Sequence, residues 1–254
     1  IMYVMYKEGL KIPEWDIIKK LNENITARIK TKYGITREIN IKDSIRQGGV
    51  LSVNQYALLM DEISKEIDKQ KLGTYIPSLE ETIGCLLWMD DVVLISSKPA
   101  ELQKMLDITY DIACRYHIEF GKEKSKAMKI GGGKTNQPEF RLGDMILEYT
   151  DKYKYLGEIL NNKNNMTDHI SATKGKVEAA YQTILTITGN STFKEIEMQV
   201  VWELVECCIT AIITYGAETW YTTKTEMDKL NKLMDNIIKR ILMVPQSTPR
   251  EALY

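Results

Sequence analysis

The feature that most limits what this chain of 254 residues can fold into is a pair of short apolar runs. The runs cover residues 83–88 and 92–95, and only Met89-Asp90-Asp91 separates them. Two apolar runs around so short a connection predict a β-hairpin. The two acids then lie at its bend.

The paired acids of this bend present an electrostatic problem, because like charges held close together repel one another. A divalent cation relieves the repulsion, and Mg²⁺ prefers carboxylate oxygens together with phosphates and water. The alternative is that Asp90 and Asp91 are solvated turn residues, since aspartate is common in turns. The apolar flanks, and the lack of a glycine or asparagine to shape the bend, favour the metal-binding interpretation.

A second constellation, Arg46-Gln47-Gly48-Gly49, precedes a predicted helix. Consecutive glycines allow a close backbone approach, while the arginine and glutamine supply donors for a phosphate or a base. An ordinary tight turn would use the same glycines. The segment is therefore a candidate nucleotide- or template-binding loop, with a plain turn as the alternative.

Helices and short strands alternate over the first 160 residues. Apolar spacing of three and four residues predicts helices, and alternation predicts strands. Ser52 is the expected N-cap of one helix, and Pro99 is the expected first-turn residue of another. The predicted helices are 13–32, 54–69 and 99–116, and the predicted strands are 35–41, 127–130, 140–142, 145–149 and 153–160.

An asparagine-rich stretch, residues 161–165, marks a change in character. Beyond it follow three long helical patterns, at about 167–188, 193–213 and 224–243. This order predicts an α+β layer followed by a helical bundle.

The overall composition limits the class of protein. With 44% hydrophobic and 27% charged residues, the chain can bury a core. Its 34 basic and 35 acidic residues give no general support to nucleic-acid binding, although several lysines cluster locally. No apolar run approaches the roughly 18 residues that cross a bilayer, so we expect an intracellular protein without a membrane partner. The clustered lysines are Lys122, Lys124, Lys126, Lys129 and Lys134.

Five motifs in a fixed order now resemble one family. Arg46-Gln47-Gly48-Gly49-Val50-Leu51-Ser52 and Trp88-Met89-Asp90-Asp91-Val92-Val93-Leu94 are similar to motifs B and C of the reverse transcriptases of non-LTR (LINE-like) retrotransposons. Residues 121–126 resemble motif D, and residues 153–157 resemble motif E, the primer grip. Tyr215-Gly216-Ala217-Glu218-Thr219-Trp220 and the helix after it resemble the thumb and post-thumb segment.

The resemblance implies a right-hand polymerase fold of the α+β class. We expect a partial palm, in which an antiparallel sheet carries helices on one face, followed by an all-α thumb. The implied divisions are residues 1–48 for a residual fingers and palm segment, 49–161 for the palm with motifs B to E, and 166–254 for the helical thumb and post-thumb segment.

The activity implied by the resemblance is RNA-directed DNA polymerisation by two-metal nucleotidyl transfer. Its partners are an RNA template, a DNA primer and deoxynucleoside triphosphates, and its cofactor is Mg²⁺ or Mn²⁺. The roles carried over are metal binding for Asp90 and, in a lesser or indirect way, Asp91; proton donation for Lys124; contact with nucleotide and template for Arg46, Gln47, Gly48 and Gly49; and primer grip for Tyr155, Leu156 and Gly157.

The chain also departs from the family pattern. Motif A, a strand with the first metal-binding aspartate, is expected ahead of the helix near Pro13, and none of the preceding residues fits it. Asp16 is interpreted as a helix-start acid. We therefore expect this chain alone to be inactive or nearly so. Two alternatives are a non-catalytic nucleic-acid-binding remnant and a plain α+β interaction domain, which the near-neutral charge keeps open.

Overall fold

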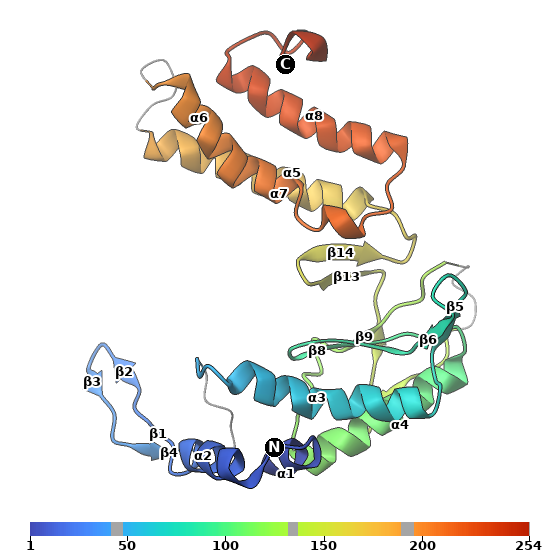
Figure 1. Cartoon of the computed structure of the whole chain (residues 1–254). Coiled ribbons are helices and arrows are strands. Elements are labelled where there is room, and N and C mark those ends of the chain that lie inside the picture. The colour runs from blue at the N-terminus through green and yellow to red at the C-terminus, as the bar shows by residue number, and fades with distance from the viewer. Residues whose placement is uncertain (42–47, 132–136, 189–195, 254) are drawn as a thin grey trace. The chain divides into compact units, whose positions relative to one another are not determined.

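The computed structural model describes residues 1–41, 48–131, 137–188 and 196–253 (Figure 1). The contacts divide the chain into two compact units. Unit 1 contains Ile1–Ser125 and Pro138–Leu147, and unit 2 contains Lys126–Gln137 and Glu148–Tyr254. In this division the strands of residues 152–161 belong with the helices that follow them.

Four helices and a series of short strands make up the described part of unit 1. The second long helix, α4, starts with a proline at its first turn and ends at His117, whose left-handed backbone (φ +56°) stops the helix. This confirms the predicted limits of that helix. The helices are α1 (Met2–Lys7), α2 (Ile12–Asn22), α3 (Ser52–Lys69) and α4 (Pro99–Tyr116). The strands are β1 (Thr26–Ala27), β2 (Lys30–Thr31), β3 (Gly34–Ile35), β4 (Ile39–Asn40), β5 (Thr74–Ile76), β6 (Glu81–Ile83), β7 (Cys85–Trp88), β8 (Asp91–Leu94), β10 (Arg141–Leu142) and β11 (Met145–Ile146).

Two predictions for unit 1 are wrong. The helix predicted over 13–32 ends at Asn22, and the chain turns at Asn24 (φ +56°) into β1–β4. The helical spacing of apolar residues continued past that point, but Ile29 is 55% exposed and belongs to no buried stripe. Ser52 is the first residue of α3 and not its N-cap, which is Leu51 and makes no side-chain capping bond.

The core of unit 1 lies between α3, α4 and the β7–β8 hairpin. β7 contacts α3, and β8 contacts α4. Apart from Leu72, which follows α3, the buried side chains come from the inward stripes of the two helices, because apolar residues three and four apart share one face of a helix. They are Met60, Ile63, Ile67, Leu72, Met105 and Ile112.

Two glycines allow the backbone to close around this core. A Cβ atom at Gly84 would lie 2.2 Å from the Leu72 carbonyl oxygen, and one at Gly73 (φ +137°) would lie 2.4 Å from the Ile83 carbonyl oxygen. The segments that lead into β5 and β7 therefore approach each other too closely for any side chain. Only glycine satisfies both positions without a backbone shift.

Unit 2 consists of short strands followed by helices. A buried carboxylate, Glu226, caps its last long helix: Glu226 and Thr223 form a reciprocal capping box, and Glu226 also accepts a hydrogen bond from the Met166 backbone N–H at 2.8 Å. These backbone bonds lower the pKa of Glu226. The elements are β9 (Lys126–Ala127), β12 (Glu148–Tyr149), β13 (Lys152–Tyr155), β14 (Glu158–Asn161), α5 (Thr167–Ile187), α6 (Met198–Leu204), a π-helical turn (Val205–Thr210), α7 (Ala211–Ile213), a 3₁₀ turn (Ala217–Thr219), α8 (Lys224–Ile241) and a 3₁₀ turn (Arg250–Ala252).

The helices of unit 2 share one apolar core. α5 and α8 confirm the helices predicted at about 167–188 and 224–243. The helix predicted at about 193–213 starts at Met198 in the described residues and includes a π-helical turn; residues 193–195 lie outside the described residues. α5 contacts α7 and α8. Each contributes one buried stripe, as packing of amphipathic helices requires. The buried core residues are Ile170, Val177, Tyr181, Ile184, Val201, Val205, Ile209, Ile213, Leu230, Ile237 and Ile241.

The mixture of helices and strands confirms the expected class, but the expected single antiparallel sheet is not observed. Among the described residues the strands pair two by two, and β9 pairs with β12 in parallel. The strands are only two to four residues long. Strands this short present only a few backbone groups at each outer edge, which leaves little for a third strand to pair with.

One helical stretch does not meet the expectation that every segment is too short or too polar to cross a membrane. In the part of the chain that the structure describes, Met198–Thr219 is long and apolar enough by length and composition alone. Val201, Val205, Ile209 and Ile213 of this stretch lie in the core of unit 2. One such helix is weak evidence for a membrane span.

The close approach at Gly84 gives a stability prediction. Gly84→Ala places a methyl group against the Leu72 carbonyl oxygen, and the resulting shift should lower the free energy of unfolding by about 1–3 kcal/mol. Gly175→Ala is the control, because a Cβ there meets nothing within 4 Å and Gly175 lies inside α5. It should stabilise by roughly 0.5–1 kcal/mol. Urea unfolding followed by circular dichroism measures both, and equal effects of the two changes would contradict the packing described here.

Candidate functional site

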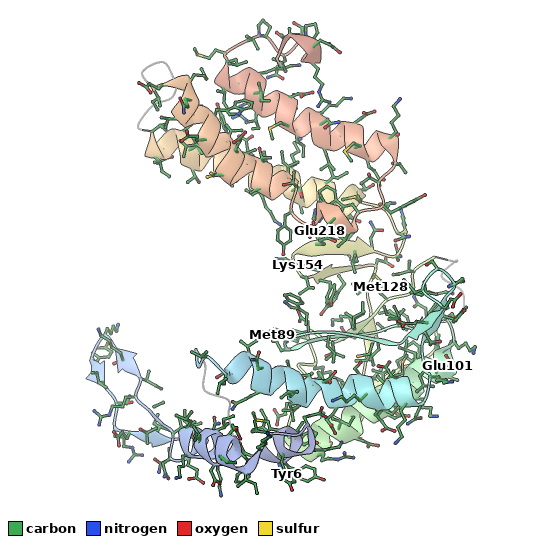
Figure 2. All side chains as sticks on the ribbon, in the orientation of Figure 1. Tyr6, Met89, Glu101, Met128, Lys154 and Glu218 are labelled. Carbon is green, nitrogen blue, oxygen red and sulfur yellow. The ribbon has the colours of Figure 1, made fainter. Side chains whose placement is uncertain are left out.

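The predicted hairpin with acids at its bend is confirmed as β7–β8. The strands pair antiparallel, with Trp88 opposite Asp91, so Met89 and Asp90 form a two-residue turn. Met89 has φ +54°, the left-handed value that such a turn takes at its first central position. Figure 2 labels Met89 at the end of the hairpin. Both aspartates are exposed.

The register of the hairpin separates an apolar inner face from an outer face. Cys85 opposite Leu94, and Leu87 opposite Val92, pack against the core of unit 1. Residues directly opposite in a ladder share a face, and successive residues alternate. Asp91 therefore shares the outer face with Trp88, which is 63% exposed.

One of the hairpin acids, Asp90, acts electrostatically on a residue of α3. Burial raises the pKa of the Tyr56 hydroxyl, and the negative charge of Asp90 raises it further. Tyr56 belongs to the second turn of α3, and it packs against the core of unit 1. Asp90 is thus within electrostatic reach of the helix that follows Gly48 and Gly49.

The two carboxylates have the right chemistry for a hard divalent cation, but they do not make a complete site. Over the described ranges, no group of three or more His, Cys, Asp or Glu side chains could hold a metal ion. Two-metal polymerase chemistry depends on carboxylates that clamp both ions. The cation expected for this site therefore lacks a full protein ligand set among the residues described.

The predicted nucleotide- or template-binding loop is described only in part. Arg46 and Gln47 lie outside the described residues. Gly48 has φ +79°, and a Cβ there would meet no atom of the described residues within 4 Å. The Ser52 N–H donates to the Gly49 carbonyl oxygen at 3.1 Å, which joins this turn to the start of α3.

Lys124, the predicted proton donor, lies in an exposed turn after α4. The backbone N–H groups of Lys124 and Ser125 both donate to the Gly121 carbonyl oxygen, at 3.1 and 2.9 Å. The turn is therefore well defined by its own backbone. The catalytic role of Lys124 stays a prediction.

The predicted primer grip lies at the turn between β13 and β14. Tyr155 pairs with Glu158, so Leu156 and Gly157 form another two-residue turn. Both have positive φ, +46° and +92°, as a type I′ turn requires. Leucine rarely adopts this conformation, which costs roughly 1–2 kcal/mol per residue, so the surrounding contacts must hold it.

A segment about sixty residues further along the chain supplies those contacts. The Tyr215 hydroxyl donates to the Leu156 carbonyl oxygen at 2.8 Å. The Tyr215 ring lies so close that a Cβ at Gly157 would come within 2.8 Å of it. The turn thus fits against the ring only because residue 157 is glycine.

The same segment binds the first residue of β14. The Glu158 carboxylate accepts hydrogen bonds from the Trp220 indole N–H at 2.8 Å and from the Thr219 hydroxyl at 3.2 Å. A Cβ at Gly216 would lie 1.8 Å from this carboxylate. We call Tyr215, Gly216, Thr219 and Trp220 the hairpin clamp. The sequence had indicated this segment, but nothing in it had indicated Glu158.

A buried histidine lies beside the clamp. His169 is 4% exposed; its Nδ1 accepts a hydrogen bond from the Ile159 N–H at 3.3 Å, and its ring meets the Trp220 ring edge-on, with centroids 5.6 Å apart. Within the described residues its Nε2 is the buried side-chain atom that lacks a hydrogen-bond partner. Burial lowers the pKa of His169, Glu158 opposes this, and Lys176 adds to it. The folded protein therefore favours neutral His169.

Comparison with known proteins places this chain in a family. The reverse transcriptase (RNA-dependent DNA polymerase) family matches residues 6–160, which include β7–β8 and most of the β13–β14 hairpin. This stretch is more than half of the chain. The chain therefore belongs to the reverse transcriptase family.

One relative is described as transposon-derived. The chain is 24% identical over 168 residues to a protein of Caenorhabditis elegans that is described as transposon-derived. The alignment covers 65% of this chain and 59% of the worm protein. The chain thus spans less than two thirds of that relative.

The hairpin clamp gives a prediction for Glu158. Glu158→Ala leaves the half-buried indole N–H of Trp220 without its acceptor, which should cost about 1–3 kcal/mol in unfolding free energy. Glu158→Gln keeps an acceptor oxygen and should lose clearly less. Urea unfolding, with hydrogen exchange at Ile159 and Leu160, measures the effect. Glu251→Ala, an exposed change, is the control, and an equal loss for the alanine and glutamine variants at 158 would contradict the clamp.

The buried imidazole gives a prediction of pH dependence. Because burial lowers the pKa of His169 below its ordinary value of 6.5, protonation favours the unfolded chain, and the free energy of unfolding should fall as the pH drops below about 6.5. His169→Gln should flatten this dependence between pH 7 and 5. His117→Asn, a change at the exposed second histidine, should leave it intact. Identical pH profiles for all three proteins would refute the assignment.

Proposed function

We propose that this chain supplies the palm and thumb of an RNA-directed DNA polymerase from a non-LTR retrotransposon. One observation carries the proposal: the adjacent carboxylates of Asp90 and Asp91 stand exposed at the bend of the β7–β8 hairpin, in a chain of the reverse transcriptase family. Asp90 and Asp91 are the proposed ligands of a divalent cation, Mg²⁺ or Mn²⁺, which would balance negative charge on a reacting nucleotide.

The other proposed contacts follow the order of the motifs. Gly48 and Gly49, with Arg46 and Gln47 before them, would lie against the nucleotide and template, and Lys124 would donate a proton. The Leu156-Gly157 turn would hold the primer end. The helices from Thr167 onward would grip the duplex backbone as the thumb. The substrates are an RNA template, a DNA primer and deoxynucleoside triphosphates.

We further propose that the chain needs another carboxylate to catalyse nucleotide transfer. The support is the pair of hairpin aspartates without a third ligand among the described residues. The same observation favours a second function, in which the chain binds a primer–template duplex without extending it. One measurement distinguishes the two functions.

That measurement is primer extension on an RNA template with Mg²⁺ or Mn²⁺. The chain alone should bind the primer–template duplex and extend it weakly or not at all. A version extended ahead of Ile1 by an aspartate-bearing strand from a related reverse transcriptase should extend the primer. Asp90→Asn in that version should lower the rate by about 10²–10³-fold, the usual cost of losing one group that stabilises transition-state charge.

Asp111→Asn, an exposed change on α4 with the same loss of charge, is the matched control and should leave the rate unchanged. Salt-dependent duplex binding by the extended version, without any extension, would favour the second function. Extension that is equally fast with Asp90 and with its asparagine variant would defeat the catalytic proposal.

A further inference from the structure

Residues 24–41 form a projecting arm that is built unlike the rest of unit 1. Its backbone is a ladder of β1 with β4 and of β2 with β3, with Thr36 N–H to Ile29 oxygen at 3.0 Å joining the two pairs. Figure 1 shows the β2–β3 hairpin extending away from α2. None of the eighteen residues is buried. The arm therefore adds nothing to the core, and its sequence is free to serve contacts outside the fold.

The charge of this arm is opposite to that of the chain. It contains four cations and one carboxylate, a net charge of +3, whereas the whole chain has a formal net charge of −1. Arg28 pairs with the arm's carboxylate, Glu38, at 2.7 Å. Over the residues the structure describes, Lys30, Lys32 and Arg37 form no ion pair. Three unpaired cations on a thin exposed ladder attract a polyanion.

The tip of the arm adds an aromatic surface. Tyr33 is 88% exposed, and the Lys32 ammonium lies 4.9 Å from the centre of its ring. The Thr31 hydroxyl accepts a hydrogen bond from the Tyr33 N–H at 3.2 Å, and Gly34 (φ +130°) completes the turn. An exposed ring next to cations is the arrangement on which unpaired bases stack while the lysines meet phosphates.

We propose that the basic arm, residues 24–41, binds an unpaired nucleic-acid strand, with Lys30, Lys32 and Arg37 on its phosphates and Tyr33 stacked on a base. Calling this strand the template rests on the proposed function, because the arm leads directly into the Arg46–Gly49 segment. The binding itself does not rest on it. RNA and DNA strands share the required chemistry, so both serve as probes.

The experiment measures binding of the full chain to a fluorescent 20-nucleotide RNA without secondary structure, to DNA of the same sequence, and to the corresponding duplex, over a range of salt concentrations. The variant Lys30→Gln/Lys32→Gln/Arg37→Gln should weaken strand binding by about tenfold at low salt and reduce the slope of log affinity against log salt by about two. The control Lys69→Gln/Lys71→Gln/Lys104→Gln removes the same charge from exposed positions outside the arm and should change neither quantity as much.

Tyr33 provides a second, independent comparison. Tyr33→Ala should weaken strand binding by roughly five- to tenfold, whereas Tyr33→Phe, which keeps the ring, should not. Preference for RNA over DNA would assign part of the recognition to the 2′-hydroxyl; equal binding would assign it to phosphates and stacking. Either result supports the arm.

Three results would overturn the proposal: equal losses for the arm variant and its control, no loss for the arm variant, or tighter binding to the duplex together with no effect of Tyr33→Ala. None of them bears on the polymerase proposal, because that is decided by primer extension and by Asp90. Conversely, if the extended version copies no template, the arm variant can still weaken strand binding, and the proposal for the arm then stands.

Discussion

Burial of one face of the β7–β8 hairpin against α3 and α4 determines where the acids of this chain lie. The alternation of side chains in a strand makes this constraint strict, since a slip of one residue would turn Leu87 and Val92 outward and Asp91 toward the core. An unpaired carboxylate in that core would be costly. The apolar residues of the hairpin therefore hold the charged ones in place, even though they never contact a substrate.

The two hairpins proposed to act on nucleic acid both contain a turn with an unfavourable backbone conformation, and their surroundings differ. Each has a non-glycine residue with positive φ at the first position of its turn, Met89 in one and Leu156 in the other. The first turn contains Asp90, is followed by Asp91 and is exposed, while the second is held by Tyr215 and, through Glu158, by Trp220. Strained turns that persist in a fold are held by their surroundings, and in unit 2 those surroundings can be named.

Much of the fold followed from the sequence, and the limits have physical causes. Local patterns fixed α4 and the β7–β8 hairpin, because their signals, a first-turn proline and two apolar runs around a short bend, act within a few residues. The helix predicted over 13–32 failed because spacing reports periodicity and not whether a core lies opposite. The hairpin that carries Asp90 was recognisable from its apolar runs, while the role of Asp90 stays a prediction. The structural role of Glu158 was not recognisable, because it depends on a hydrogen bond from Trp220, which lies 62 residues further along the chain. Roles assigned by resemblance to Lys124 and to the glycines of the loop remain predictions.

The clamp joins parts of the chain that are 59 to 62 residues apart. A shortened chain that ended before Tyr215 would still contain the whole sequence of the Leu156-Gly157 turn. It would lack the clamp residues that hold the turn in its conformation. A mutation in the clamp can thus disrupt the turn although the sequence of the turn itself is unchanged. An intact turn sequence is therefore a weaker sign of a structured turn than the same sequence together with the remote residues that support it.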